Sequence, residues 1–309
     1  MPAMIILNPY ANRWKAGRFT AQVKSLLTEL GYDFELAQTR VPGEAIGLAA
    51  AAAKAGYDPI VAAGGDGTIS EVVNGLLRVE AAARPRLGLL PLGSANDYAF
   101  QLGIPLTLEG ACRTLAAAAH ERTLDAGLIN DHYFMNDIAI AFGARVNIEA
   151  ATIKRLRGSL IYLGGVFKAL MRYHLPTVTF EWDGGRLENK PILLAYVGNG
   201  WRTGGVFFLS PHARLDDGRF DLLVGDALNR WQILKLLPKT FSGNHIHDPA
   251  AHMYSCTWLR IHSDDPLPVL ADGEIIYRDC HDLEIRLLPA ALRVISGPAE
   301  GQRPPVKPG

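Results

Sequence analysis

The chain has 309 residues, of which 49% are apolar and 20% charged, and its 31 Lys and Arg residues balance its 31 Asp and Glu residues. This composition is typical of a globular protein large enough for two domains, and the zero net charge excludes a global positive field for nucleic acid. The three widely spaced cysteines, Cys112, Cys256 and Cys280, form no Cys-x-x-Cys pair, which indicates reduced thiols in a cytoplasmic protein.

No signal peptide or membrane-spanning segment is expected. The apolar run at residues 4–7 is too short for the apolar region of a signal peptide. The most apolar long window, 160–171, is too short to span a bilayer and contains Lys168.

The first part of the chain alternates predicted strands and helices. We expect strands over residues 4–7, 34–37, 60–63 and 87–90, and helices over 18–30, 43–55, from 69 onward, up to 101, and over 108–119. This repeat predicts a doubly wound α/β domain with a parallel sheet and helices on both faces. Ligands of such sheets bind beyond the carboxyl ends of the strands.

Two glycine-rich loops follow strands of this predicted sheet. In the first, Gly64, Gly65 and Gly67 allow the backbone to approach a ligand closely, and the next helix offers free N–H groups to phosphate oxygens. Asp66 beside a phosphate would require Mg²⁺ between the two charges, and Thr68 suits a helix cap or a phosphate contact. A tight turn before a capped helix is an equally good interpretation of this loop alone.

The second loop, PLGSAND at 91–97, has the same character. Gly93 permits close approach, Ser94 suits a helix cap or a phosphate contact, and Asn96 lies in the first turn of the following helix. Neither loop matches the P-loop or the dinucleotide fingerprint.

The pattern changes near Asp125 to short alternating runs separated by turns. Strands are expected over 132–140, 177–182, 192–197, 220–224, 258–261 and 283–287, interrupted by helices over 148–172 and 230–241. We therefore expect an α/β domain at 1–123, a mainly antiparallel β domain at 124–296 and a flexible Pro- and Gly-rich tail at 297–309.

Six motifs occur in order along the chain: Asn-Pro at 8–9, GGDGTISEVVNGL at 64–76, PLGSANDYA at 91–99, LDAG at 124–127, LDDG at 215–218 and ADGE at 271–274. Together they resemble the diacylglycerol kinase catalytic-domain family, and in particular the bacterial lipid kinases that are similar to sphingosine and ceramide kinases. The resemblance extends from Asn8 to about residue 295. It implies an α/β nucleotide domain like that of NAD kinases, followed by an antiparallel β-sandwich that binds the lipid.

The resemblance also implies roles for individual residues. Asp66 and Asp125 would organise a catalytic Mg²⁺, and Glu274 would act as the base toward the acceptor hydroxyl. Asp217 and the backbone carbonyls of Arg214 and Arg219 match a second, structural Mg²⁺ site of bacterial members. The implied cofactor-binding residues are Asn8, Thr39, Gly64, Gly65, Asp66, Gly67, Thr68, Glu71, Gly93, Ser94, Asn96 and Asp272.

The function implied by the resemblance is transfer of the γ-phosphate of ATP, with Mg²⁺, to a hydroxyl of a membrane lipid such as diacylglycerol. Charge neutralisation at the phosphate and a carboxylate near the alcohol are what this chemistry needs. We expect a cytoplasmic enzyme in transient contact with the inner face of the membrane, and a homodimer remains open. NAD kinase and a non-catalytic nucleotide- or lipid-binding regulator are the alternatives, and Glu274 alone would also suit an ordinary hairpin turn.

Two further segments carry weaker signals. The spacing of His245, His247, Asp248 and His252 permits a metal site, although a polar loop beside the lipid site is favoured. The basic residues of the 154–157 segment, Lys154, Arg155 and Arg157, precede an apolar helix that either packs on the second domain or docks on anionic lipid headgroups.

Overall fold

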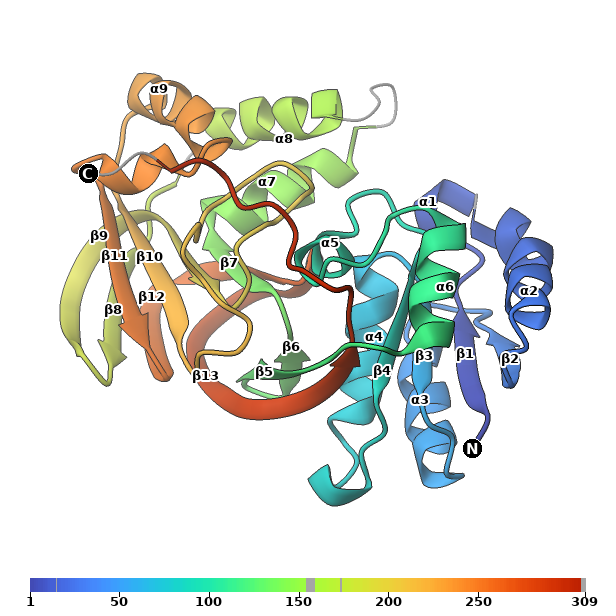
Figure 1. The fold of residues 1–309 in the computed structure, drawn as a ribbon. Helices are drawn as coiled ribbons and strands as arrows, with labels where there is room; N and C mark the ends of the chain where they lie inside the picture. Colours follow the sequence, from blue (N-terminus) through green and yellow to red (C-terminus); the bar gives the residue numbers. More distant parts are fainter. Residues whose placement is uncertain (15, 154–158, 173, 307–309) are drawn as a thin grey trace. The chain divides into compact units, whose positions relative to one another are not determined.

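The computed structural model describes residues 1–14, 16–153, 159–172 and 174–306, and its contacts divide the chain into two compact units. Unit 1 contains Met1–Ala126, Tyr133–Met135 and Leu288–Gln302, and unit 2 contains Gly127–His132, Asn136–Leu287 and the residues from Arg303. Two strands, β5 (Glu121–Ile129) and β13 (Glu274–Ile295), contribute residues to both units (Figure 1). No local sequence pattern indicated that the end of β13 returns to unit 1.

The sheet of unit 1 is parallel, as expected. Its strands lie in the order β2-β1-β3-β4, and Val294 of β13 pairs in parallel with Leu87 of β4. All residues of β3 and β4 are buried, which agrees with their short apolar sequences. The strands are β1 (Ala3–Leu7), β2 (Phe34–Gln38), β3 (Ile60–Gly64) and β4 (Leu87–Pro91).

The helices of unit 1 form two pairs, α3 with α4 and α2 with α6. Helices α3 and α4 approach closely because Gly75 has no side chain: a Cβ there would lie 2.4 Å from the carbonyl oxygen of Ile46. The α-helices are α1 (Ala11–Trp14), α2 (Thr20–Glu29), α3 (Glu44–Lys54), α4 (Asp66–Leu76), α5 (Asp97–Gln101) and α6 (Leu108–Ala117), and the 3-10 helices are η1 (Ala16–Phe19) and η2 (Ala81–Ala83).

The strand order creates a switch point between β1 and β3. From β1 the chain proceeds to β2 on one side and then to β3 on the other, so the loops after these strands diverge at one edge of the sheet. Asn8, Thr39, Gly65 and Leu92 each follow a strand at this edge. The predicted nucleotide-binding loops therefore lie where ligands of such sheets bind.

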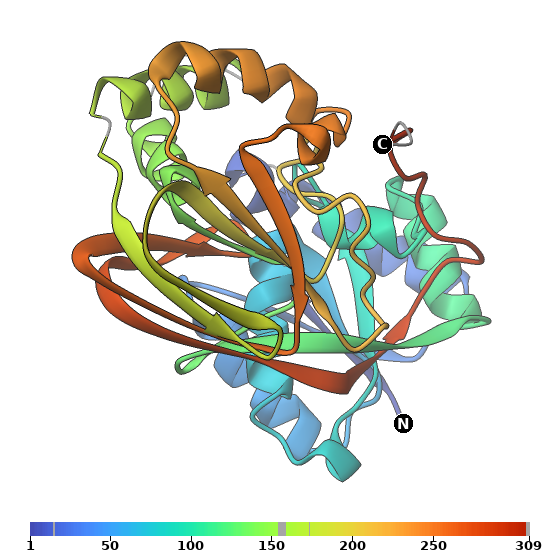
Figure 2. The same ribbon diagram turned by 90° about the vertical axis from the view of Figure 1, so that its left-hand side faces the viewer.

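Unit 2 is built on antiparallel strands. They pair in the order β11-β10-β9-β7-β12-β13, and β8 pairs with both β9 and β12 (Figure 2). The long strands β9 and β12 thus belong to both layers of a sandwich. Besides β13, the strands after β5 are β6 (His132–Phe134), β7 (Asp137–Ala141), β8 (Thr177–Trp182), β9 (Gly185–Gly198), β10 (Phe220–Asp226), β11 (Ala251–Cys256) and β12 (Trp258–Ala271).

Several elements of unit 2 differ from the sequence-based expectation. β12 is much longer than predicted, because Pro266 and Pro268 interrupt its pattern at the point where its register to β13 shifts, and strands tolerate proline at bulges. The expected strand over 132–140 is two strands, and β11 was not expected.

The expected helix over 148–172 corresponds to two helices, α7 (Phe142–Ala151) and α8 (Ser159–Met171). The basic residues Lys154, Arg155 and Arg157 lie outside the described residues.

Helix α9 (Arg230–Thr240) begins at a capping box, in which the Asn229 side chain accepts the N–H of Gln232 and the Gln232 side chain accepts the N–H of Asn229. Its inner face contributes Ile233 to an apolar cluster that also contains Val146 of α7 and Val166 of α8. Among the described residues, no helix is long and apolar enough to cross a bilayer.

The tail that we expected to be flexible makes specific contacts as far as the structure describes it. In unit 1, the Gly297 N–H donates to Leu102 O at 2.9 Å and Glu300 forms an ion pair with Arg122 at 2.9 Å. In unit 2, the Arg303 guanidinium lies 5.5 Å from the ring centre of Trp201. The composition of the tail suggested disorder, but its glycines allow close approach to the folded chain.

Candidate active site

The two glycine loops of unit 1 are in backbone contact. A Cβ placed on Gly93 would lie 2.3 Å from the Cα of Gly65, and the Leu92 N–H donates to Gly64 O at 2.8 Å. Asn96 holds the second loop by accepting the Gly93 N–H at 2.9 Å, and it adopts a left-handed conformation. Only glycine permits this approach, so the predicted loops form one structure at the carboxyl edge of the sheet.

A methyl group at Gly93 is therefore expected to force the two loops apart. We predict that Gly93→Ala lowers the free energy of unfolding by about 1–3 kcal/mol and weakens nucleotide binding roughly tenfold or more. Urea unfolding and nucleotide titration would measure both effects. The matched control is Gly47→Ala within α3, where a Cβ would meet nothing within 4 Å and a stabilisation of about 0.5–1 kcal/mol is expected. Equal behaviour of the two variants would contradict the prediction.

Asn8 connects the loop after β1 to α4. Its side-chain amide donates to the Thr68 hydroxyl at 3.0 Å, and its side-chain oxygen accepts the Tyr10 N–H at 2.9 Å. Thr68 is buried at the start of α4, and a Cβ on Gly64 would lie 2.3 Å from its hydroxyl oxygen. The structure thus brings Asn8, Gly64 and Thr68 together, although they come from separate loops.

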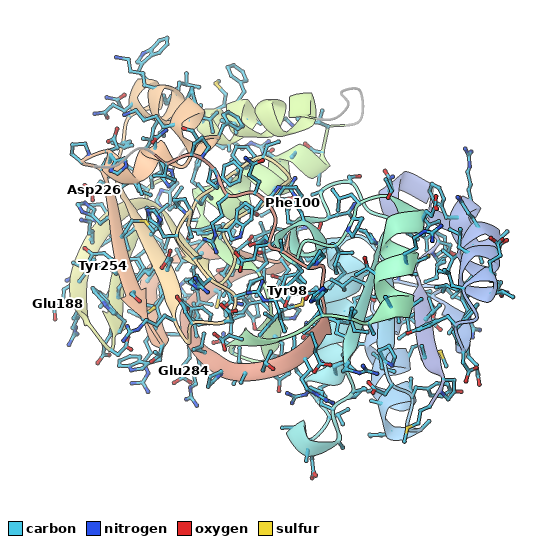
Figure 3. The ribbon with its side chains drawn as sticks, viewed as in Figure 1. Tyr98, Phe100, Glu188, Asp226, Tyr254 and Glu284 are labelled. Atoms are coloured by element: carbon cyan, nitrogen blue, oxygen red, sulfur yellow. The ribbon has the colours of Figure 1, made fainter. Side chains whose placement is uncertain are left out.

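Asp66 connects the two glycine loops electrostatically. Its carboxylate accepts the Tyr98 N–H at 3.3 Å, at the beginning of α5 (Figure 3). Burial raises the pKa of Asp66, while backbone N–H groups of Tyr98, Asn96 and Asp97 oppose that rise. A partly buried carboxylate beside the predicted phosphate-binding loops suits a divalent cation, which would stabilise its charged form.

The remaining predicted residues of unit 1 have different surroundings. Glu71 accepts the N–H groups of Gly43 at 2.9 Å and Ala45 at 3.2 Å, so its side chain caps the start of α3. Thr39 is buried directly after β2, and exposed Ser94 donates to the Asn12 side chain at 3.2 Å. This contact with Asn12 had no signal in the sequence.

Asp125 lies buried on β5, where its carboxylate accepts the Ala290 N–H at 2.8 Å. In the described ranges, no group of three or more His, Cys, Asp or Glu side chains could hold a metal ion. In phosphoryl-transfer sites Mg²⁺ is usually held by one or two carboxylates together with substrate phosphates and water, and Asp66 and Asp125 are the carboxylates predicted for that role here.

In unit 2, Glu274 is exposed and follows a tight turn between β12 and β13. Asp272 and Gly273 both have positive φ, and Ala271 pairs with Glu274 across the turn. The Asp272 side chain is buried and accepts the N–H groups of Asn136 at 2.8 Å and Asp137 at 3.2 Å. Asp272 therefore fixes the turn that presents Glu274.

A buried polar network supports this turn and was missed by the sequence analysis. The side-chain amide of Asn136 donates to Asp137 Oδ2 and to the backbone carbonyl of Arg202, both at 2.8 Å. The backbone carbonyl of Asn136 accepts the Asn199 N–H at 2.9 Å. The available signal was Asn136-Asp137 itself, because two adjacent polar residues inside an otherwise apolar run suggest a buried hydrogen-bonded pair.

The residues predicted for a second metal site lie in the turn before β10. Asp217 accepts the Arg219 N–H at 3.1 Å, and Arg214 is 3.5 Å from Asp216. The structure adds Asp221, whose pKa is raised to about 6 by burial and by the negative charge of Asp217. Asp217 in this turn and Asp221 in β10 therefore repel each other, and such neighbouring carboxylates suit a cation.

The histidine segment is not a metal site in this structure. His252 Nε2 lies 2.9 Å from Asp226 at the end of β10 (Figure 3), whereas Asp248 is paired with Lys239 at 2.8 Å. His245 is buried, and its Nε2 donates to Leu209 O at 3.2 Å. These side chains have different partners because His252 lies on strand β11, whereas His245 and His247 lie in the 3-10 helix η3 (Asn244–His247).

Burial lowers the pKa of His245 to about 4, from an ordinary value near 6.5. The unfolded chain therefore binds the proton more readily, so stability is full above pH 6.5 and decreases as the pH falls toward 4. Between pH 7 and pH 4.5, the free energy of unfolding of the wild type should fall by about 1–3 kcal/mol more than that of His245→Gln. Urea unfolding at several pH values checks this, and a difference that stays constant with pH would refute it.

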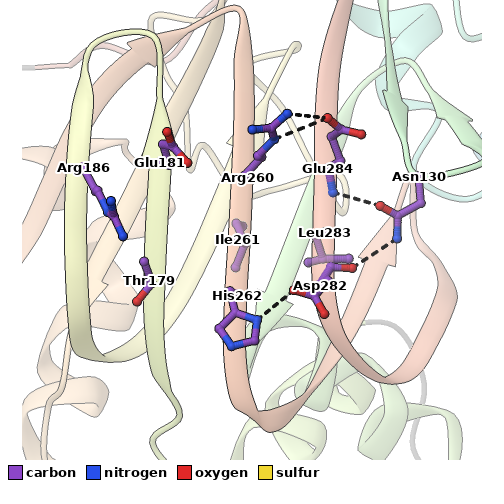
Figure 4. A pocket seen from close by; sticks show the side chains of 10 residues that line it. All are labelled: Asn130, Thr179, Glu181, Arg186, Arg260, Ile261, His262, Asp282, Leu283 and Glu284. Atoms are coloured by element: carbon purple, nitrogen blue, oxygen red, sulfur yellow. Dashed lines mark hydrogen bonds and ion pairs between the residues drawn. The ribbon is translucent and has the colours of Figure 1, made fainter.

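One hollow among the described residues is a charged sheet face of unit 2. It measures about 630 Å³, and across β9, β8, β12 and β13 it shows the alternating series Arg186, Glu181, Arg260 and Glu284 (Figure 4). Arg260 and Glu284 are 3.3 Å apart. Opposite charges on neighbouring strands compensate one another, so this hollow offers a ligand little net charge.

Comparisons with known proteins agree with this arrangement. The family model for the diacylglycerol kinase catalytic domain matches residues 2–129, and that for the YegS C-terminal NAD kinase beta sandwich-like domain matches residues 137–296. A relative named "Diacylglycerol kinase" from Bacillus subtilis is 33% identical over 278 residues, which cover 88% of this chain and 89% of the relative. The chain belongs to the diacylglycerol kinase family. Kinases of this family are phosphotransferases, so the predicted enzyme class is confirmed.

Another relative, named "Probable lipid kinase YegS-like", from Chromohalobacter salexigens, is 34% identical over 85% of this chain and 84% of its own length. A crystal structure of a diacylglycerol kinase from Bacillus anthracis has a TM-score of 0.73 at 22% identity, covering 97% of this chain and 98% of that one. Yeast NADH kinase has a TM-score of 0.50 at 12% identity, covering 96% and 84%. Because these identities are low, the two likenesses bear on the fold alone. They confirm the predicted architecture, which combines an α/β domain like that of NAD kinases with an antiparallel β-sandwich.

Proposed function

We propose that the protein is an ATP- and Mg²⁺-dependent lipid kinase that transfers the γ-phosphate to a hydroxyl of a membrane lipid such as diacylglycerol. The observation that carries this proposal is the contact between the two glycine loops, with Asp66 joining them. The names of the relatives favour a lipid acceptor. Access to such an acceptor requires peripheral contact with a membrane surface.

The nucleotide half of the reaction is assigned to unit 1. Gly65 and Gly93 approach each other closely and carry no side chains that would keep a ligand from the backbone, and the first turn of α4 offers phosphate oxygens N–H groups without intrahelical partners. Asn8, Thr68 and the second loop complete the predicted contacts with ATP. Asp66 and Asp125 would hold Mg²⁺, which neutralises the charge of the transferred phosphate when bound.

The acceptor half is assigned to the turn of unit 2 that presents Glu274. An exposed carboxylate there can accept the proton of an alcohol that approaches it, and a fixed turn reduces the entropy lost in positioning it. Asp272 has a positioning role, because its carboxylate is engaged with the backbone of Asn136 and Asp137. In the same unit, Asp217 and Asp221, with the carbonyls of Arg214 and Arg219, would hold the second Mg²⁺.

The test is transfer of labelled γ-phosphate from ATP to a panel of lipids in mixed micelles, with and without Mg²⁺, and with NAD as a soluble acceptor. The panel contains diacylglycerol, a sphingoid base, ceramide and phosphatidylglycerol. Magnesium-dependent labelling of a lipid is the expected result. Labelling of NAD alone would overturn the substrate class, and nucleotide binding without any transfer would indicate a regulator.

A further inference from the structure

The outer face of α9 is apolar, although its inner face already packs in the core. Trp231 is 76% exposed and Leu234 is 42% exposed. With Lys235 and Pro238 they occupy positions i, i+3, i+4 and i+7, which form one face of a helix. Ile233 lies on the opposite side and is buried. Trp231 therefore contributes little to holding the helix on its unit, and Leu234 leaves a large part of its side chain exposed.

Helix α8 repeats this arrangement. Phe167 is 65% exposed, Met171 is 61% exposed, and Lys168 lies beside Phe167 on the same face. The inner residues Val166, Ala169 and Leu170 are buried in the cluster that contains Ile233 of α9. Figures 1 and 2 both show α8 and α9 side by side. Their outer faces thus point away from one shared core.

The charges on these helices have a single sign. Neither α8 nor α9 contains Asp or Glu. From neighbouring elements, buried Glu149 faces Arg172 at 2.9 Å and Lys168 at 3.8 Å, and Asp248 pairs with Lys239 at 2.8 Å. Within the described part of the chain, Arg230 and Lys235 have no ion-pair partner within 4 Å, so uncompensated positive charge lies beside Trp231.

We propose that these outer faces dock on an anionic lipid bilayer. The docking face consists of Phe167, Met171, Arg230, Trp231, Leu234 and Lys235. Exposed aromatic and aliphatic side chains would enter the interface, while Arg230 and Lys235 would contact anionic headgroups. A second copy of the same face would bring these cations against each other, which disfavours self-association. The proposal deepens the proposed function and rests on it for its purpose, because the acceptor lipid lies in a bilayer.

Vesicle flotation tests the docking face without using activity. At about 0.1 M salt, the wild-type chain should bind vesicles of phosphatidylcholine with 30% phosphatidylglycerol and bind pure phosphatidylcholine much more weakly. Trp231→Gln with Leu234→Gln should weaken binding to the anionic vesicles about tenfold or more. Arg230→Gln with Lys235→Gln should weaken it about 25-fold, since each cation near an anionic surface contributes roughly fivefold.

The matched control is Leu106→Gln with Lys54→Gln in unit 1. Leu106 is 44% exposed and Lys54 is exposed at the end of α3. This variant therefore removes one exposed apolar side chain and one exposed positive charge from a surface outside the docking face. It should bind as the wild type does, and all variants should keep the wild-type unfolding midpoint in urea because the replaced side chains are exposed.

Equal vesicle binding by the wild type and the α9 variants would overturn the docking face, as would failure of the wild type to bind anionic vesicles. A wild-type dimer that becomes a monomer on Trp231→Gln would show that a second copy covers this face, and would also overturn it. Phosphorylation of a short-chain diacylglycerol dissolved as monomers tests the proposed function separately. The rate should be unchanged in the α9 variants, and no phosphorylation would contradict the kinase proposal while the vesicle result stands.

Discussion

Glu274→Gln is expected to lower kcat for lipid phosphorylation by about 10²- to 10⁴-fold, because glutamine cannot accept the proton of the acceptor hydroxyl. The turn should be unaffected, since Asp272 and Gly273 define its geometry and Glu274 is exposed. We therefore expect an unchanged free energy of unfolding and nearly unchanged affinity for ATP. Initial rates at saturating lipid, together with nucleotide titration, measure these quantities.

Glu284→Gln is the control for this variant. It removes an exposed carboxylate from the same strand, β13, where Glu284 forms ion pairs with Arg286 at 2.7 Å and Arg260 at 3.3 Å. Exposed ion pairs contribute little to stability, about 0–1 kcal/mol, and kcat should be unaffected. If Glu274→Gln retained more than about a third of the wild-type kcat, Glu274 would not be the base.

Asp66→Asn is expected to reduce phosphoryl transfer by roughly 10²-fold or more, because the neutral amide cannot offset the charge of a divalent cation beside the phosphates. The amide oxygen can still accept the Tyr98 N–H, so the contact between the loops should survive with a loss of at most about 1–2 kcal/mol of stability. The variant should also bind ATP with less dependence on Mg²⁺. Isothermal titration with and without Mg²⁺ measures this directly.

Asp58→Asn provides the comparison. Asp58 precedes β3 at the end opposite to Asp66 and forms an ion pair with Arg86 at 3.1 Å. Its loss should cost stability, about 1 kcal/mol, but should leave kcat and the Mg²⁺ dependence of ATP binding at wild-type values. A similar loss of activity in both variants would mean that Asp66 acts only through the fold.

Most of unit 1 could be predicted from the sequence. Short apolar runs, helical periodicity and glycines at strand ends located the parallel strands and their loops to within a few residues, as for β3 at 60–64. In unit 2, β8 was predicted at its observed bounds, whereas β12 and β13 were not predicted at their full lengths. Their lengths depend on pairing with distant strands and on bulges, which local periodicity does not record.

The sequence by itself therefore determined the family, the βα order and the identity of the polar residues at the ends of strands. Only the tertiary structure decided what those residues contact: Asp66 meets the N–H of Tyr98, 32 residues away, and Asp272 meets that of Asn136, 136 residues away. The tertiary structure also distinguished the roles of two acidic residues of α4: Glu71 caps the start of α3, whereas Asp66 contacts the second glycine loop. The physical reason is that residue type and spacing specify local backbone conformation, whereas hydrogen-bond partners depend on how distant segments pack.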